Sequence, residues 1–147
     1  MSEVQKLELS DDKQLIDTDL VYQYIAEKSY WAKGISLERL VVALENSLCI
    51  GAYLGKTQVG FCRVVTDYAT FANLLDVFVV DEYRGNGIAK QLLRFTLAHP
   101  HLQNLRRFTL TTKDAHGLYT QFGFETLGAP ERYMEIFRPD IYQQIET

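Results

Sequence analysis

The chain has little of what would place it in a membrane, outside the cell or on nucleic acid. Its only two cysteines, Cys49 and Cys62, both lie in apolar segments, which favours reduced thiols in the cytosol over a disulfide framework. No apolar run is long enough to span a bilayer, and Met1–Glu3 does not resemble the start of a signal peptide. The net charge of −4 argues against nucleic acid as the main partner. We therefore expect a cytoplasmic protein without membrane or nucleic-acid partners.

Internal repeats, low-complexity stretches and linkers are also missing. With 147 residues, of which 47% are hydrophobic and 12% aromatic, the chain can bury a core without metal ions or disulfides. No further cysteine or histidine lies at ligand spacing from the two cysteines, so no metal site is expected. The sequence predicts one domain that comprises residues 1–147.

The most informative stretch is residues 71–99. Phe71–Val80 is an apolar run rich in β-branched and aromatic residues, which predicts a buried strand. Arg84–Gly87 contains two glycines and reads as a turn, and apolar residues then recur at helical spacing from Ile88 to His99. The N-terminus of such a helix has unpaired N–H groups, and the glycines let an anion approach the backbone. This unit is therefore a candidate phosphate cradle.

Three phosphate-binding motifs are candidates for this turn. A P-loop requires Gly-Lys-Ser/Thr where the chain has Gly87–Ala89, and a dinucleotide fingerprint requires a small residue where it has Lys90. The third motif fits. Arg84–Ala89 (RGNGIA) resembles the Q/R-x-x-G-x-G/A pyrophosphate motif of the GNAT superfamily of N-acetyltransferases, and Leu118–Phe124 (LYTQFGF) resembles the L-Y-x-x-x-G-F segment of that family. The resemblance covers roughly residues 47–124.

Periodicity and turn residues predict the remaining elements. Expected strands are 4–9, 48–54, 59–66, 107–112 and a final pair, 124–127 and 132–137; expected helices are 18–28, 37–46 and 115–122, with caps at Asp17 or Thr18, at Ser36 and at Asp114. Gly55-Lys56 is read as a two-residue hairpin turn, which would place Cys49 opposite Cys62. The order of elements matches the GNAT fold, an α/β architecture with a mixed sheet and helices on both faces.

The resemblance implies acetyl-CoA as co-substrate. It assigns the following residues to its binding: Val77, Phe78, Val79, Arg84, Gly85, Asn86, Gly87, Ile88, Ala89 and Lys90. The turn would offer N–H groups and the charges of Arg84 and Lys90 to the pyrophosphate. The strand backbone would pair with the amide-rich pantetheine, and the N–H of Val79 would polarise the thioester oxygen.

Tyr119 is the candidate general acid for the departing thiolate, because it occupies the tyrosine of the second motif. The alternative is that it only packs in the core. The base is less well defined, since Asn73 stands where many relatives have a glutamate. Asp76 is the only carboxylate within the strand; it is the catalytic candidate, with simple pairing to Arg63 as the alternative. Asp67 and His116 are further candidates for the base.

The resemblance places the acceptor beside the first interhelical connection. Candidate acceptor-binding residues are Tyr30, Trp31, Arg63, Asp67, Tyr68, Phe71 and His116. Aromatic rings near a carboxylate suit a cationic or aromatic amine. The expected activity is therefore acetyl transfer to a small-molecule primary amine by direct attack. A protein lysine or N-terminus as acceptor, and a non-catalytic CoA-binding sensor or interaction module, are the alternatives, and a homodimer is left open.

Overall fold

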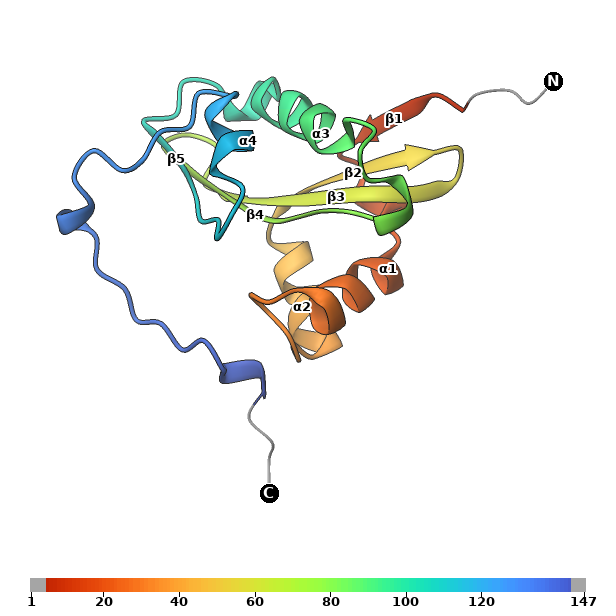
Figure 1. Ribbon diagram of the computed structural model, residues 1–147, viewed down its shortest axis with the longest axis horizontal. Coiled ribbons are helices and arrows are strands. Elements are labelled where there is room, and N and C mark those ends of the chain that lie inside the picture. The colour runs from red at the N-terminus through yellow and green to blue at the C-terminus, as the bar shows by residue number, and fades with distance from the viewer. Residues whose placement is uncertain (1–4, 144–147) are drawn as a thin grey trace.

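A five-stranded mixed sheet forms the centre of the molecule in the computed structural model, which describes residues 5–143 (Figure 1). The strands follow the chain in the order β1-β2-β3-β4-β5. They are β1 (Leu7–Ser10), β2 (Leu48–Leu54), β3 (Thr57–Thr66), β4 (Phe71–Val79) and β5 (Arg107–Leu110). The pairs β1–β2, β2–β3 and β3–β4 are antiparallel, and the pair β4–β5 is parallel. The predicted first strand begins at residue 4, which lies outside the described residues.

Helices cover both faces of this sheet. The helices are α1 (Thr18–Gln23), which continues as a π-helical turn (Tyr24–Lys28), α2 (Leu37–Glu45), α3 (Ile88–Leu97) and α4 (His116–Thr120). Figure 1 shows α1 and α2 on one side of the sheet and α3 and α4 on the other. Each side has its own buried cluster: Phe61 and Phe78 pack among the residues of α1 and α2, while Leu92 and Leu93 of α3 pack over the other face. The predicted α/β fold with helices on both faces is confirmed.

The predicted helix starts are confirmed in two of three cases. Asp17 accepts a hydrogen bond from the N–H of Leu20, and Ser36 accepts one from the N–H of Arg39, as N-caps do. The prediction of Asp114 as the cap of α4 is wrong. Ala115 is the N-cap residue there, and its own N–H donates to the hydroxyl of Thr112.

The predicted pairing of Cys49 with Cys62 is also wrong, because β3 contains a bulge. The two-residue turn is present, and Leu54 pairs with Thr57 as expected. The register then shifts between Ala52 and Tyr53, so that Ile50 lies opposite Cys62. A shift of one residue reverses which face each side chain occupies. Cys49 therefore packs in the cluster of α1 and α2, and Cys62 packs in the cluster of α3, and both thiols are free.

A second bulge interrupts β4 at Asp76. The pairing of β3 with β4 shifts between Phe61 and Arg63, and Asp76 has a φ of 55°, in the left-handed region that few non-glycine residues adopt. Leu74, before the bulge, and Val79, after it, both pack in the cluster beneath α3. In a regular strand two residues five positions apart would face opposite sides of the sheet. The bulge therefore reverses the alternation of side chains along β4.

The pairing of the two parallel strands ends just before the bulge. β4 pairs with β5 only from Phe71 to Leu74, opposite Arg107 to Leu110. The last five residues of β4 thus have no strand on this edge among residues 5–143. The sheet is open where β4 approaches the glycine turn.

The predicted final strand pair is wrong for this chain. Residues 124–127 and 133–137 belong to no strand of the described part of the chain, and Arg132 is the last residue of a short 3-10 turn. After α4 the chain instead leaves the body of the molecule and runs outside it (Figure 1). Among residues 5–143, no helix is both long enough and apolar enough to cross a bilayer.

Candidate active site

The turn between β4 and α3 presents unpaired backbone N–H groups to solvent. Gly85 and Gly87 have φ angles of 83° and 76°, a conformation that side chains rarely adopt. A Cβ added to either glycine would meet no atom within 4 Å, so the space over the turn is open. Gly87 is the N-cap of α3, no side chain caps this helix, and its first turn contains no acidic residue. The N-terminus of the ten-residue helix α3 is thus free to bind an anion.

A pocket of about 430 Å³ joins this turn to Tyr119. Its walls include nine of the ten residues predicted to bind acetyl-CoA: Val77, Phe78, Val79, Arg84, Gly85, Gly87, Ile88, Ala89 and Lys90. The tenth, Asn86, is not part of the wall, and its side-chain amide donates to the carbonyl of Tyr83 instead. The open edge of β4, the glycine turn and the phenol of Tyr119 therefore share one cavity.

Arg84 lies over the end of β4. Its Nε donates to the carbonyl of Val79 at 3.3 Å, and one terminal nitrogen donates to the hydroxyl of Tyr24 at 2.8 Å. The same guanidinium forms an ion pair with Asp81 at 3.0 Å. Both side chains of this ion pair are more than half exposed, so the pair is weak and its charge is screened by water. Arg84 thus reaches the mouth of the pocket and stays in contact with solvent.

The backbone N–H of Val79 points into the gap between β4 and β5. Val80 donates its N–H to the carbonyl of Val59 in β3. Successive N–H groups of a strand point to opposite edges, so the N–H of Val79 points away from β3. The contact of Arg84 with the carbonyl of Val79 comes from the same open side. This N–H is therefore a hydrogen-bond donor on the wall of the pocket.

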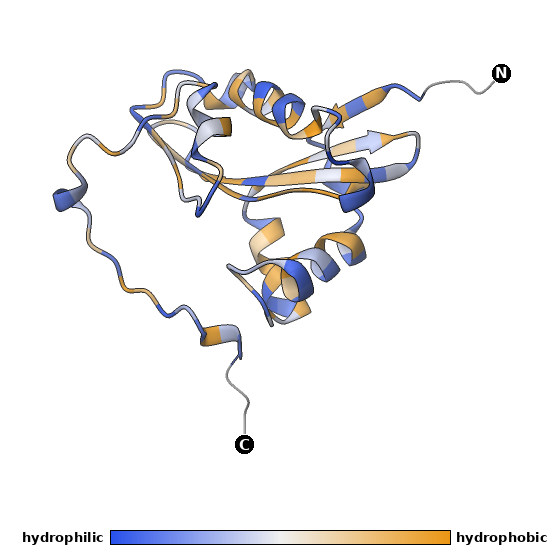
Figure 2. Ribbon diagram, viewed as in Figure 1, coloured by the Kyte–Doolittle hydropathy of each residue, from blue (hydrophilic) through white to orange (hydrophobic). Residues whose placement is uncertain are grey.

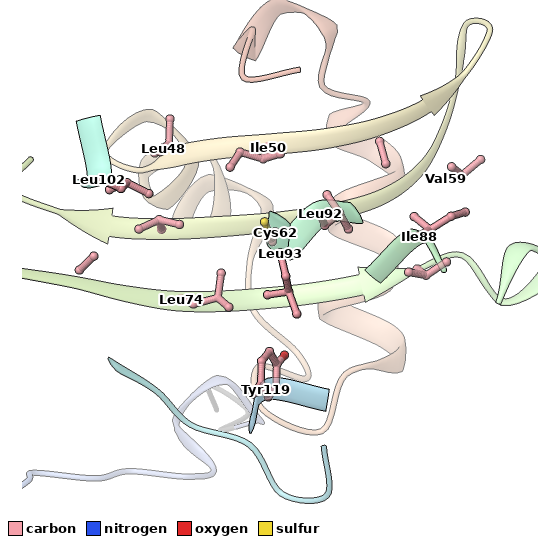
Figure 3. Close-up of a cluster of buried hydrophobic side chains, with 14 residues drawn as sticks. Leu48, Ile50, Val59, Cys62, Leu74, Ile88, Leu92, Leu93, Leu102 and Tyr119 are labelled. Atoms are coloured by element: carbon pink, nitrogen blue, oxygen red, sulfur yellow. The ribbon is translucent and has the colours of Figure 1, made fainter. Parts of the chain in front are cut away.

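Tyr119 is nearly buried beside β4. Its ring packs in the cluster that contains Leu74 and Leu93 (Figure 3). The ring centroid of Tyr119 lies 6.1 Å from that of Phe124 in an edge-on arrangement. Burial raises the pKa of Tyr119 to about 12. The phenol therefore stays protonated at neutral pH. It can donate a proton, and it cannot act as a base there.

Asp76 is held by two donors on the side of the sheet that α1 and α2 cover. Arg63 Nε donates to one carboxylate oxygen at 2.8 Å, and Trp31 Nε1 donates to the other at 2.7 Å. A terminal nitrogen of Arg63 also donates to the hydroxyl of Ser47 at 3.0 Å. The side chains of Asp76 and Arg63 are only 6% and 15% exposed, so this is a largely buried ion pair. The pairing with Arg63 that the sequence left as the alternative is present.

The connection between α1 and α2 reaches the loop that follows β5. Tyr30 accepts a hydrogen bond from the N–H of Lys113 through its hydroxyl, at 3.2 Å, and the Lys113 ammonium lies 5.5 Å from the centre of the Tyr30 ring. The rings of Tyr30 and Trp31 meet edge to face at 5.1 Å. These two aromatic residues therefore lie near Asp76 and the open end of the sheet.

A family model described as the acetyltransferase (GNAT) domain matches residues 36–126, which is more than half of the chain. The chain belongs to the GNAT family of acetyltransferases. Both motifs recognised in the sequence lie within the matched residues. A protein of Gibberella zeae that is described as an acetyltransferase is 28% identical to this chain over 133 residues. The match covers 76% of this chain and 74% of that protein.

Solved structures agree with the GNAT assignment. A protein of Xanthomonas campestris assigned to the GNAT family is 43% identical, with a TM-score of 0.94 over 97% of this chain and 100% of that chain. An acetyltransferase of Clostridium acetobutylicum, solved with acetyl-CoA, is 16% identical and has a TM-score of 0.63 over 90% of this chain and 96% of that chain. The second likeness concerns the fold alone.

Three predicted acceptor residues of this GNAT chain lie away from the others. Asp67, Tyr68 and Phe71 are at the β3–β4 turn, and Phe71 is about 16 Å along β4 from Asp76 at the usual rise of a strand. The ring centroid of Tyr68 lies 5.8 Å from that of His101, beyond the end of α3. The predicted grouping of these three residues with Tyr30 and Trp31 is therefore not found.

Asp67 has a structural role at that turn. Its carboxylate accepts a hydrogen bond from the Thr70 hydroxyl and others from the N–H groups of Ala69, Thr70 and Phe71. The Thr70 hydroxyl, followed by these N–H groups, holds the pKa of Asp67 well below its usual range. His116 is exposed at the start of α4 and lines a separate, larger cavity that also touches Tyr119.

Sequence reasoning missed four residues that line the pocket. They are Tyr24, Tyr83, Ala115 and Leu118. Tyr24 stacks on Phe78 with ring centroids 4.1 Å apart. It is 54 positions away from Phe78 in the sequence, and the predicted helix 18–28 gave no indication that the two rings meet. Its role as a wall of the pocket depends on tertiary packing.

Proposed function

We propose that the chain is an N-acetyltransferase that transfers the acetyl group of acetyl-CoA to a small-molecule primary amine by direct attack within a ternary complex. One observation supports this proposal most strongly. The uncapped N-terminus of α3, the open edge of β4 and the phenol of Tyr119 line the same pocket. These three groups suit a thioester that carries phosphates: the turn can bind the phosphates, the strand edge can pair with amides, and the phenol can donate a proton to the leaving thiolate.

The binding of acetyl-CoA follows from the unpaired backbone groups. The N–H groups of the first turn of α3 and the glycine turn would bind the pyrophosphate, with Lys90 and Arg84 adding positive charge. The free edge of β4 would pair with the amides of the pantetheine as a strand would. The bound co-substrate supplies an acetyl thioester, and the N–H of Val79 would donate a hydrogen bond to its carbonyl oxygen. The 430 Å³ pocket gives these groups a common site.

Tyr119 would donate the proton that the leaving thiolate takes up. A thiol has a pKa near ~8.5, whereas the pKa of Tyr119 is raised to about 12, so this transfer is uphill. A thiolate is already a fair leaving group without protonation. The contribution of Tyr119 therefore belongs at the lower end of the roughly 10²–10⁴-fold range for general acids.

The acceptor amine would bind beside Tyr30 and Trp31, on the face of the sheet away from α3. An alkylammonium must lose a proton before attack. Because both oxygens of Asp76 already accept hydrogen bonds, we assign this residue the role of holding Trp31 in place rather than that of the base. The amine would then lose its proton to water. The two free, buried cysteines suit a protein of the reducing cytoplasm.

An amine-panel screen tests the proposal. Acetyl-CoA and each amine are mixed with the enzyme, and the released thiol is measured with a chromogenic disulfide. We expect turnover with a subset of primary amines, and initial-rate lines that intersect when both substrates are varied, as a ternary complex requires. Parallel lines would indicate an acetylated enzyme and contradict direct attack.

One observation favours the alternative, a module that binds CoA without catalysis. Asn73, which replaces the expected glutamate, accepts a hydrogen bond from the Thr109 hydroxyl at 2.7 Å and cannot act as a base. Such a module would bind acetyl-CoA with normal affinity but release no thiol with any amine or with peptides that contain lysine or a free N-terminus. Release with the peptides alone would instead assign a protein acceptor.

A further inference from the structure

The segment after α4 exposes apolar side chains that the rest of the molecule does not cover. We call residues 133–137 the arm. Met134 is 97% exposed, Ile136 86% and Phe137 69%, which is unusual for three large hydrophobic residues within four positions. Figure 2 shows hydrophobic positions along this segment, where it runs clear of the body. Its alternating residues were predicted from the sequence to form a strand.

A cavity that we call the slot lies beside β5. It has a volume of about 950 Å³, and its lining includes β5 with its continuation, residues 107–112, and residues 122–128 of the segment that follows α4. Apolar side chains form part of its lining: Leu97, Phe108, Leu110, Phe122 and Phe124. Within residues 5–143, the outer edge of β5 pairs with no strand. An unpaired edge of this kind is a ready template for another strand.

Tyr133, the first residue of the arm, lines the slot, whereas residues 134–137 do not, and the arm is held at both ends. At its start, the hydroxyl of Tyr133 accepts a hydrogen bond from Arg107, whose guanidinium also lies 5.3 Å from the centre of the tyrosine ring. Beyond its end, Tyr142 packs against the cluster of α1 and α2, with its carbonyl against Gly34.

We propose that the protein is a homodimer in which the arm of each chain inserts as a strand between β5 and residues 124–127 of the other. Five residues in extended conformation are about 16 Å long, which suits the four residues of β5. Insertion would bury Met134 and Ile136, which lie on one side of the arm, against the apolar lining of the slot. It would also pair the outer edge of β5.

The exchange would add a wall to the candidate active site. His116 and Tyr119 line the slot, and Tyr119 also lines the acetyl-CoA pocket. A strand of the second copy in the slot would therefore cover the far side of Tyr119 and exclude water from it. This inference does not depend on the proposed activity, because its test measures mass.

A proline at position 135 distinguishes a dimer that forms by strand exchange from a dimer that uses another surface. An inserted strand has a neighbour on each edge, so every N–H of its interior donates to one strand or the other. Glu135→Pro removes one such donor and restricts the preceding residue, and Pro is not tolerated inside a sheet. Glu135→Ala removes the same side chain but keeps the N–H and is the matched control. Molar mass is measured by sedimentation equilibrium, and folding is followed by circular dichroism and thermal melting.

We expect the wild type and Glu135→Ala to have twice the chain mass of 16.9 kDa, and folded Glu135→Pro to have the mass of a single chain. Ile136→Lys, which places a charge in the apolar slot, should also be a monomer. If the proline variant does not fold, the molar mass of Ile136→Lys tests the proposal alone. A monomeric wild type, or a dimer that persists in both Ile136→Lys and folded Glu135→Pro, would overturn the proposal.

Discussion

Tyr119 and Asp76 show how surroundings assign different tasks to two ionisable side chains of one site. Tyr119 lies among apolar residues of β4, α3 and α4, and burial keeps its phenol neutral. Asp76 lies between Arg63 and Trp31, which come from another strand and from an interhelical connection. The first can donate a proton, whereas the second is a charged acceptor that holds its neighbours in position.

Tyr119→Phe should lower kcat about 100-fold and leave the affinity for acetyl-CoA almost unchanged. The substitution keeps the ring and its packing and removes only the hydroxyl, so thermal stability should also change little. Steady-state kinetics and calorimetric binding measure the two effects. A variant with wild-type kcat would show that Tyr119 is only a core residue and that water protonates the thiolate.

The pH profile gives an independent check on the same phenol. The pKa of Tyr119 is raised from 10 to about 12, so the proton-donating form persists up to that pH. We therefore expect no loss of kcat attributable to this residue below about pH 11 in the wild type. A wild-type decline centred near pH 10 that vanishes in Tyr119→Phe would contradict the raised pKa.

Asp76→Asn should destabilise the protein by about 3 kcal/mol, because it leaves the largely buried guanidinium of Arg63 without its partner charge. Asparagine also tolerates the left-handed backbone at this position, so the bulge itself should survive. If Asp76 positions Trp31, KM for the amine should rise more than kcat falls, and the low-pH limb of the profile should stay. Loss of that limb together with most of kcat would identify Asp76 as the base instead.

Two bulges decide which face of the sheet each side chain of β3 and β4 occupies. Turn residues predicted the hairpin at Gly55-Lys56 correctly. The extra residue in β3 that separates Cys49 from Cys62 has one trace in the sequence, the neighbouring Gly60, but a glycine within a strand can equally mark a close contact with another element. The bulge at Asp76 has one trace in the sequence, a carboxylate in an apolar strand, which the sequence could equally assign to catalysis. A bulge depends on the fit between neighbouring strands, and local propensities do not contain that information.

Replacing both cysteines with alanine should leave turnover within about twofold of the wild type. Burial raises the pKa of the Cys49 thiol, and it raises that of Cys62 to about 12, so neither thiol ionises at neutral pH. Each substitution removes one buried atom and should cost about 1 kcal/mol of unfolding free energy. A folded variant that releases no thiol from acetyl-CoA would point to a catalytic cysteine and overturn direct attack.

On the scale of the whole molecule, periodicity and motifs in the sequence predicted the fold and the place of the pocket. The strand–turn–helix unit of residues 71–99 and the sheet with helices on both faces are found as predicted, and nine of the ten residues that the family resemblance assigned to acetyl-CoA binding line one pocket. The predicted final strands do not form within residues 5–143, because a sequence pattern that suits a strand does not show that a neighbouring strand is available to pair with it. Asp67, Tyr68 and Phe71 lie apart from Tyr30 and Trp31 for a related reason, since a sequence does not show which end of a sheet a turn occupies.

The central claim, that the glycine turn binds acetyl-CoA, is tested most directly by calorimetric titration of acetyl-CoA into the wild type and into Gly87→Asp. The aspartate would place a negative charge in the open space over the turn and should weaken binding by about 2–4 kcal/mol. Gly55→Asp is the matched control, because Gly55 also has a positive φ but lies in the β2–β3 hairpin. We predict micromolar-range binding in the wild type and in Gly55→Asp, about 30- to 1000-fold weaker binding in Gly87→Asp, and folded protein in all three. Equal affinity of folded Gly87→Asp and the wild type would contradict the account.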